Sequence, residues 1–107
     1  MAFEVLQVAV QLVGALRAPV EGLARRDRNL ADQVRRAASS VALNVSEGNR
    51  RCGKDRLHLF RIAAGSAAEV RTALDVAEAW GHLDGGVLGD ARALLDRELA
   101  MLWRLTH

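Results

Sequence analysis

The sequence predicts an all-α protein folded as an antiparallel up-down-up-down four-helix bundle. Apolar residues recur every three to four positions along most of the chain, and no segment alternates with a period of two. Four such segments are separated by short polar or glycine-containing connections, which is typical of a bundle. The 107 residues suffice for one domain, 1–107, and half of them are apolar. A domain of this size and composition can bury a core without a metal ion or disulfide bridges.

The first helix is expected at about 3–23. Pro19 should kink or end it, because proline lacks the N–H that an interior helical position donates. Nine of the twelve residues from 5 to 16 are apolar, more than one core face can bury. We therefore predict self-association through this helix. Its expected buried stripe consists of Leu6, Ala9, Val13, Leu16, Val20 and Leu23.

The apolar run in this first helix does not resemble a targeting or membrane segment. Glu4 precedes it where a signal peptide would be basic, and Gln7 and Gln11 interrupt it before the ~20 apolar residues of a membrane span. The single cysteine, Cys52, cannot form an intramolecular disulfide and gives no sign of an oxidising compartment. We expect a cytoplasmic protein without membrane contact.

The second helix is expected at about 30–47, with Asn29 as its N-cap and Asp32 at its third helical position. Gly48 should end it, and the polar run 47–54 should form a loop. The buried positions of this helix are Leu30, Val34, Ala37 or Ala38, Val41 and Val45.

The third and fourth helices are expected at about 55–80 and 86–105. Gly81 is a natural C-cap, and residues 84–86 form the turn between the two helices. The third helix has a stripe of Phe60, Ala63, Ala67, Val70, Leu74 and Ala77. The stripe of the fourth consists of Leu88, Ala91, Leu95, Leu99 and Leu102, with Leu105 at its end.

Charge is unevenly distributed along the chain. The segment 25–61 holds ten basic and four acidic residues, whereas the remainder is acidic. Such a basic segment favours a phosphate backbone, and a homo-oligomer would repeat it. The alternative is a set of ordinary helix-surface pairs, Asp32 with Arg35 and Arg36 and Glu47 with Arg51. The candidate RNA or DNA contacts are Arg35, Arg36, Arg50, Arg51, Lys54 and Arg56.

Other residue types argue against base stacking, metal binding and catalysis. The four aromatic residues all accompany apolar stripes, so any nucleic acid should be bound through its backbone. His58, His82 and His107 are far apart and lack ligand spacing, and no second cysteine joins Cys52. We expect no metal, no cofactor and no enzymatic activity. A hydrolase site at Glu47 and His58 is a minor alternative that would require a shared cleft.

The run from Asp32 to Gly48, DQVRRAASSVALNVSEG, and the run from Arg61 to Glu69, RIAAGSAAE, resemble signatures of the bacterial four helix bundle protein family, also called 23S rRNA intervening-sequence proteins. The resemblance covers essentially the whole chain, with departures at Ala42 and at Arg25-Arg26. It implies an antiparallel four-helix bundle that assembles as a homopentamer. A related bundle, the accessory variability determinant of diversity-generating retroelements, is basic and works with a reverse transcriptase and its RNA. That analogy favours a nucleic-acid or nucleic-acid-enzyme partner.

The polar residues within these signatures have a structural interpretation, which we favour over a binding pocket. Arg36 with Glu69, or Asn44 with Ser66, would form an inter-helix network that fixes register around a close-packed Gly65. The candidate network residues are Gln33, Arg36, Asn44, Glu47, Ser66 and Glu69.

The sequence thus leads to two hypotheses of function. The first is a non-enzymatic homo-oligomer that offers an arginine-rich surface to RNA or DNA backbone. The alternative is a protein-protein interaction scaffold in which the basic segment of one subunit pairs with the acidic remainder of a neighbour.

Overall fold

The computed structural model describes residues 2–107, which form four α-helices and one short 3-10 helix and contain no β-strand. This confirms the predicted all-α class. The elements are α1 (Phe3–Ala24), α2 (Arg28–Asn49), α3 (Gly53–Ala79), η1 (Gly85–Leu88) and α4 (Gly89–Thr106).

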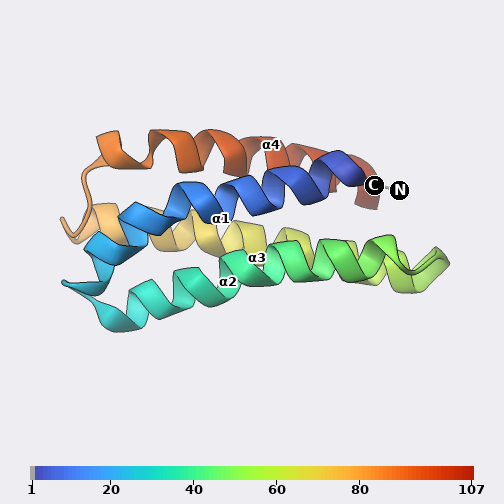
Figure 1. Cartoon of the computed structure of the whole chain (residues 1–107), viewed down its shortest axis with the longest axis horizontal. Coiled ribbons are helices and arrows are strands. Elements are labelled where there is room, and N and C mark those ends of the chain that lie inside the picture. The colour runs from blue at the N-terminus through green and yellow to red at the C-terminus, as the bar shows by residue number, and fades with distance from the viewer. Residues whose placement is uncertain (1) are drawn as a thin grey trace.

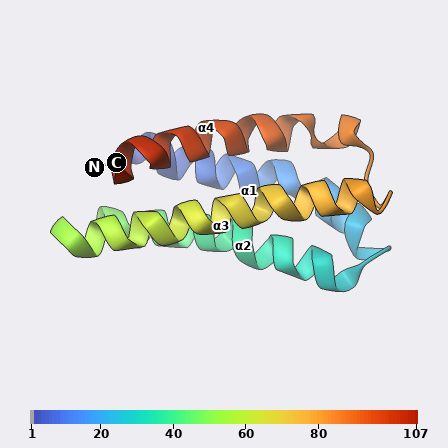
Figure 2. The ribbon, with the colours of Figure 1, turned by 180° about the vertical axis from the view of Figure 1, so that it is seen from behind.

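The four helices lie side by side along the long axis of a molecule that measures 42 × 22 × 20 Å (Figure 1). The connections lie at alternate ends of the molecule, and both chain termini are found at the same end. Viewed from either side, α1 neighbours α4 and α2 neighbours α3 (Figure 2). α2 and α3 extend past the other two helices at the end where the termini lie.

The core consists of two clusters of buried apolar residues. The larger one fills most of the length of the bundle and includes Leu12, Val34 and Leu74. The smaller one surrounds Phe60, near the connection between α2 and α3. The predicted stripes of the second and third helices are buried in full, with both Ala37 and Ala38 in the core.

The stripes of α1 and α4 differ from the prediction. In α1, Leu6 is only half-buried and Val13 is 39% exposed, whereas Val5, Val8 and Leu12 are buried. Nearly the whole circumference of α1 is apolar, so packing rather than hydropathy decides which face is covered. In α4, Leu99 is half-buried and Leu105 is 40% exposed; the buried positions around them are Glu98, Met101 and Thr106.

The start of α2 also differs from the prediction. Its N-cap is Asp27 rather than Asn29, and the Asp27 carboxylate accepts a hydrogen bond from the Leu30 amide at 3.0 Å. Either residue type can cap a helix, and the cap lies at Asp27 because helical geometry already begins at Arg28. In the preceding helix, α1 continues through the buried Pro19 to Ala24, so of the two effects expected of this proline, a kink or an end, it does not end the helix.

Gly48 does not end α2, and the polar run 47–54 is mostly helical. The helix continues to Asn49, and α3 begins at Gly53. Gly48 is buried, and a Cβ atom placed on it would lie 2.6 Å from Cε1 of Phe60. Its glycine therefore serves close packing between α2 and α3 rather than helix termination.

The end of α3 agrees with the predicted C-cap. Gly81 has a φ of 77°, which favours glycine. The Gly81 amide donates to the Glu78 carbonyl and the His82 amide to the Ala77 carbonyl, both at 2.9 Å. These two bonds form a Schellman motif, which turns the chain toward η1.

Candidate nucleic-acid interface

The connection between α2 and α3 carries a cluster of cations at one end of the molecule. We call this cluster the basic tip, defined by Arg50, Arg51, Lys54 and Arg56. The Arg50 amide donates to the Glu47 carbonyl at 3.0 Å and the Arg51 amide to the Gly48 carbonyl at 3.1 Å, which keeps the turn tight. Gly53 opens α3 with a φ of 59°. Because the connection is short, the tip is carried on two helix ends that project beyond α1 and α4 (Figures 1 and 2).

The charges of the basic tip are only partly neutralised. Glu47 accepts from Arg51, with Oε1 and Nη2 2.7 Å apart, and its Oε2 lies 3.9 Å from Nη1 of Arg50. The guanidinium of Arg56 lies 5.3 Å from the centre of the Phe60 ring, a cation–π distance. Lys54 is exposed and forms no ion pair with residues 2–107. Even when the exposed carboxylate of Asp55 is counted together with Glu47, the four cations outnumber the acidic groups and leave a positive surface that can bind phosphate.

The remaining two predicted contacts lie elsewhere. Arg35 and Arg36 are exposed at the middle of α2, ~22 Å from Arg50 along the helix axis. Arg35 pairs with Asp32 at 3.2 Å, as the helix-pair alternative predicted, whereas Arg36 forms no ion pair in the described chain. Both line a shallow hollow of about 400 Å³ together with Ser39, Ser40, Leu43 and Asn44. The six predicted contacts therefore form two separate groups.

The predicted polar network is replaced by a smaller one. The Ser40 hydroxyl lies 2.9 Å from the Ser66 hydroxyl, and the Asn44 side-chain amide donates to the Ser40 hydroxyl and carbonyl, both at 2.9 Å. Asn44 thus reaches Ser66 only through Ser40, which was not among the candidate residues. The missed signal is the i, i+4 spacing of Ser40 and Asn44 on one helix face.

Other members of the proposed network lie outside this cluster. Gln33, Arg36 and Glu69 are exposed, and within the described residues no hydrogen bond joins Arg36 to Glu69. Glu47 bonds to the arginines of the basic tip instead. Gly65 is also exposed, and a Cβ atom placed on it would have no neighbour within 4 Å among the described residues, so it is not the close-packed glycine.

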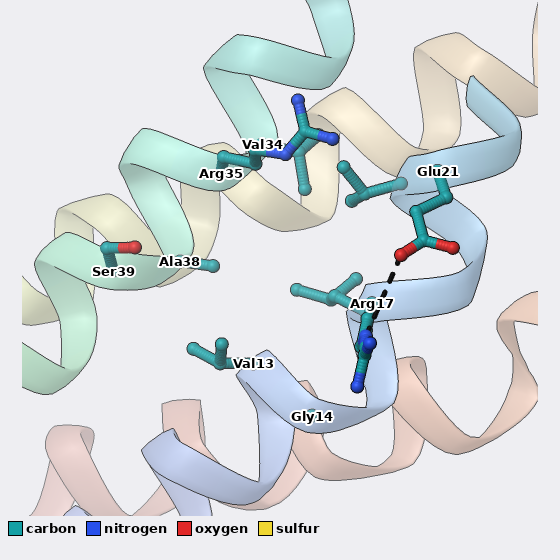
Figure 3. A pocket seen from close by; sticks show the side chains of 10 residues that line it. Val13, Gly14, Arg17, Glu21, Val34, Arg35, Ala38 and Ser39 are labelled. Carbon is teal, nitrogen blue, oxygen red and sulfur yellow. Dashed lines mark ion pairs between the residues drawn. The ribbon is translucent and has the colours of Figure 1, made fainter. Parts of the chain in front are cut away.

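A groove runs between α1 and α2, about 360 Å³ in volume (Figure 3). Its floor is apolar and includes Leu16, Val20 and Val34. Arg17 and Glu21 of α1 pair across one turn at 3.6 Å on its rim. The opposite rim is formed by the exposed Arg35 and Ser39 of α2, and the buried Ala38 lines the groove between them.

The outer face of α1 leaves large apolar side chains in water. Phe3, Val10 and Val13 are 66%, 58% and 39% exposed, and Val13 also borders the groove. The most apolar stretch of the helix has a mean hydropathy of 1.3, and 33% of it is buried. By length and composition α1 would suffice to cross a membrane, a property that core helices of soluble proteins share. Exposed apolar side chains in a row mark a surface suited to association.

Glu98 of α4 is a buried carboxyl that was not among the candidate residues. It is 0% exposed, and neither of its carboxylate oxygens has a hydrogen-bond partner in residues 2–107. Burial raises its pKa to about 8. The signal was available, since Ala91, Leu95, position 98 and Leu102 follow a four-three-four spacing that continues the core stripe.

The histidines and Cys52 are not brought together. Within residues 2–107 no three His, Cys, Asp or Glu residues are placed to share a metal ion. His82 lies 3.8 Å from the Asp27 carboxylate at the opposite end of α2 from the basic tip. His58 is exposed on α3, Glu47 is bonded to arginines, and no hydrogen bond joins the two in the described residues.

Comparison with known proteins identifies a family and a similar solved structure. The model of the 23S rRNA-intervening sequence protein family matches residues 1–104. The structure is similar to the crystal structure of a protein of unknown function from the S23 ribosomal protein family of Bacteroides thetaiotaomicron, with a TM-score of 0.84. The two chains are 13% identical over 95% of this chain and 97% of the other, a likeness that shows the shared fold alone. No curated protein matches the sequence.

Proposed function

The chain belongs to the 23S rRNA-intervening sequence protein family, and from this premise we propose that it is a non-enzymatic homo-oligomer that binds the phosphate backbone of RNA or DNA. The basic tip is the binding surface. We further propose that the helices are arranged antiparallel, up-down-up-down, and that the protein acts in the cytoplasm.

The observation that carries the proposal is the exposure of the basic tip. Its cations lie on the projecting turn between α2 and α3 and at the start of α3, where a nucleic acid can approach without meeting α1 or α4. Cys52, the N-cap of α3, makes no side-chain capping bond, so the positive end of the α3 dipole is added to the same surface, where Asp55 in the first turn offsets part of it. Backbone contacts of this kind bind without reading sequence and are strongly salt-dependent.

Assembly would raise the affinity of the small basic tip for nucleic acid. The exposed apolar face of α1, with Phe3 and Val10, supports burial against another copy of the chain. The resemblance to the family favours five copies. A ring would repeat the basic tip, and simultaneous contacts raise the overall affinity well above that of one tip.

Binding is tested by fluorescence anisotropy with labelled mixed-sequence RNA and DNA at several salt concentrations. We expect Kd to rise about tenfold or more between ~50 and ~200 mM salt. Changing Arg50, Arg51 and Lys54 together to alanine should abolish most of the binding and flatten this dependence. The matched control changes Arg25, Arg26 and Arg71, which are equally charged and exposed but lie away from the tip. Equal losses in both variants would refute a role of the tip.

Assembly is tested by size-exclusion chromatography with light scattering. Val10→Glu should release monomers, because it places a charge on the outer face of α1. Val87→Glu is the control, since Val87 is exposed to a similar extent, 56% against 58%, but lies on η1. A wild-type monomer would contradict the assembly proposal.

A second candidate function, the interaction scaffold, is favoured by exposed carboxylates on α4. Asp90 and Asp96 form no ion pairs within the described chain and are available to the basic tip of a neighbouring subunit. This alternative predicts that high salt dissociates the oligomer itself, and that nucleic acid is not bound at any salt concentration.

A further inference from the structure

The strongest feature outside the proposed interface is Glu98, at the centre of α4. Its side chain is fully buried, and both oxygens lack a hydrogen-bond partner in the part of the chain that the structure describes. A buried carboxylate without partners is costly, so the group is held there as the neutral acid.

Glu98 lies between the two core clusters. Leu95, one turn before it, belongs to the larger cluster, and Met101 and Leu102, one turn after it, belong to the cluster around Phe60. The smaller cluster is apolar throughout, with Val5 and Val8 from α1, Val45 from α2, and Phe60 and Ala63 from α3. Any charge that forms on Glu98 therefore disturbs the junction on which the second half of α4 packs.

Within residues 2–107 no charged group compensates for this burial. Arg97 is the one charge that lowers the pKa of Glu98, and its effect is smaller than that of burial. Arg97 itself is exposed, and its guanidinium forms an ion pair with the Glu4 carboxylate of α1, with Nη2 and Oε1 3.2 Å apart. The other titratable or charged groups on this half of the packed helices are exposed or half-buried and do not bond to Glu98: Glu47 of α2 and Arg56, His58, Arg61 and Glu69 of α3.

We propose that Glu98 is a pH-sensitive latch that holds the second half of α4 on the bundle. With its proton, the side chain packs as a neutral group and residues 95–106 close the Phe60 cluster. When Glu98 loses its proton to water, hydration of the charged carboxylate favours a conformation in which this segment separates from the core. The surface ion pair between Arg97 and Glu4 is too exposed to hold the segment by itself.

The latch is tested first on the wild-type chain. Carboxyl carbon NMR should show Glu98 titrating near pH 8. Hydrogen exchange in residues 95–106, corrected for intrinsic exchange, should lose about tenfold protection or more between about pH 6.5 and about pH 9.5. Amides in the middle of α2 should keep their protection over the same range. Titration of Glu98 below about pH 6, or unchanged protection at about pH 9.5, would overturn the proposal.

Two variants complete the test. Glu98→Gln and Glu98→Leu remove the ionisable group, and in whichever of them folds, protection of residues 95–106 should no longer depend on pH. Asp96→Asn is the matched control, because it removes an exposed carboxylate from the same helix. A pH response that survives in the Glu98 variants, or disappears in the Asp96 variant, would refute the latch.

Discussion

Gly48→Ala should destabilise the protein, although the same change stabilises most helices. Gly48 lies inside the last turn of α2, with Phe60 of α3 packed against it. An added Cβ would lie 2.6 Å from Cε1 and 2.8 Å from Cδ1 of that ring, far inside contact distance. Phe60 is only 1% exposed, so its ring is enclosed by neighbouring side chains that would have to move with it.

The expected magnitude follows from two opposing effects. Alanine is favoured over glycine in a helix interior by ~1 kcal/mol. Overpacking a buried contact typically costs ~1–3 kcal/mol, and the short distance places this site in the upper part of that range. The net loss in the free energy of unfolding should be ~1–2 kcal/mol.

Gly65→Ala provides the matched comparison. Gly65 is an exposed position inside α3, and nothing in the described chain lies within 4 Å of its added Cβ. This variant should gain most of the ~1 kcal/mol of helix propensity. Urea unfolding of both variants and the wild type, followed by circular dichroism at one protein concentration, measures the difference. If Gly48→Ala were as stable as Gly65→Ala, close packing at Gly48 would not be what the glycine provides.

Three further predictions concern the helix cap, the buried acid and one ion-pair cluster. Asp27→Ala should lower the free energy of unfolding by ~1 kcal/mol, because the Leu30 amide loses its acceptor. Asn29→Ala should change the free energy of unfolding little. Thermal unfolding distinguishes the two variants, and equal effects would argue against Asp27 as the cap. The pKa of Glu98 is raised to about 8 from 4.5, so between these values the folded chain holds a proton that the unfolded chain has released. The contribution of this group to stability should therefore be highest below about pH 4.5 and should fall by ~3–5 kcal/mol as pH rises from there through about 8, which urea titrations of the wild type and Glu98→Gln across this range would check. Arg92→Ala should cost ~1 kcal/mol, because the guanidinium joins α4 to two carboxylates of α3 at 2.9 and 2.7 Å; a loss below about 0.3 kcal/mol in chemical denaturation would show that this cluster is dispensable.

The sequence predicted the helices themselves well, since each coincides with a segment of helical apolar spacing. The agreement is best in α3, where Phe60, Ala63 and Ala67 begin one narrow stripe that is buried along its whole length. Helix ends were less predictable. Asp27 and Asn29 are both good caps by residue type, and Gly48 is the residue type expected at a helix terminus although it occupies a packing position.

The residues of the candidate site could be predicted from the charge of the sequence, but their arrangement in space could be predicted less well. Exposure of Arg50, Arg51 and Lys54 follows from a short charged connection. The predicted helix at about 30–47 already separates them from Arg36, because a helix keeps the two groups a fixed distance apart. The structure adds that α2 extends to Asn49 and α3 begins at Gly53, so the tip lies on two helix ends and not on a longer loop.

The sequence by itself determined the all-helical class, the number of helices and the basic segment, because these depend on local spacing and charge. Tertiary structure decided which face of α1 is buried and which apolar side chains stay in water, since several faces of that helix are equally hydrophobic. It also decided that Glu98 is buried and Gly48 is closely packed. Both depend on which side chains from other helices lie opposite, and that information is not contained in the spacing of any one helix.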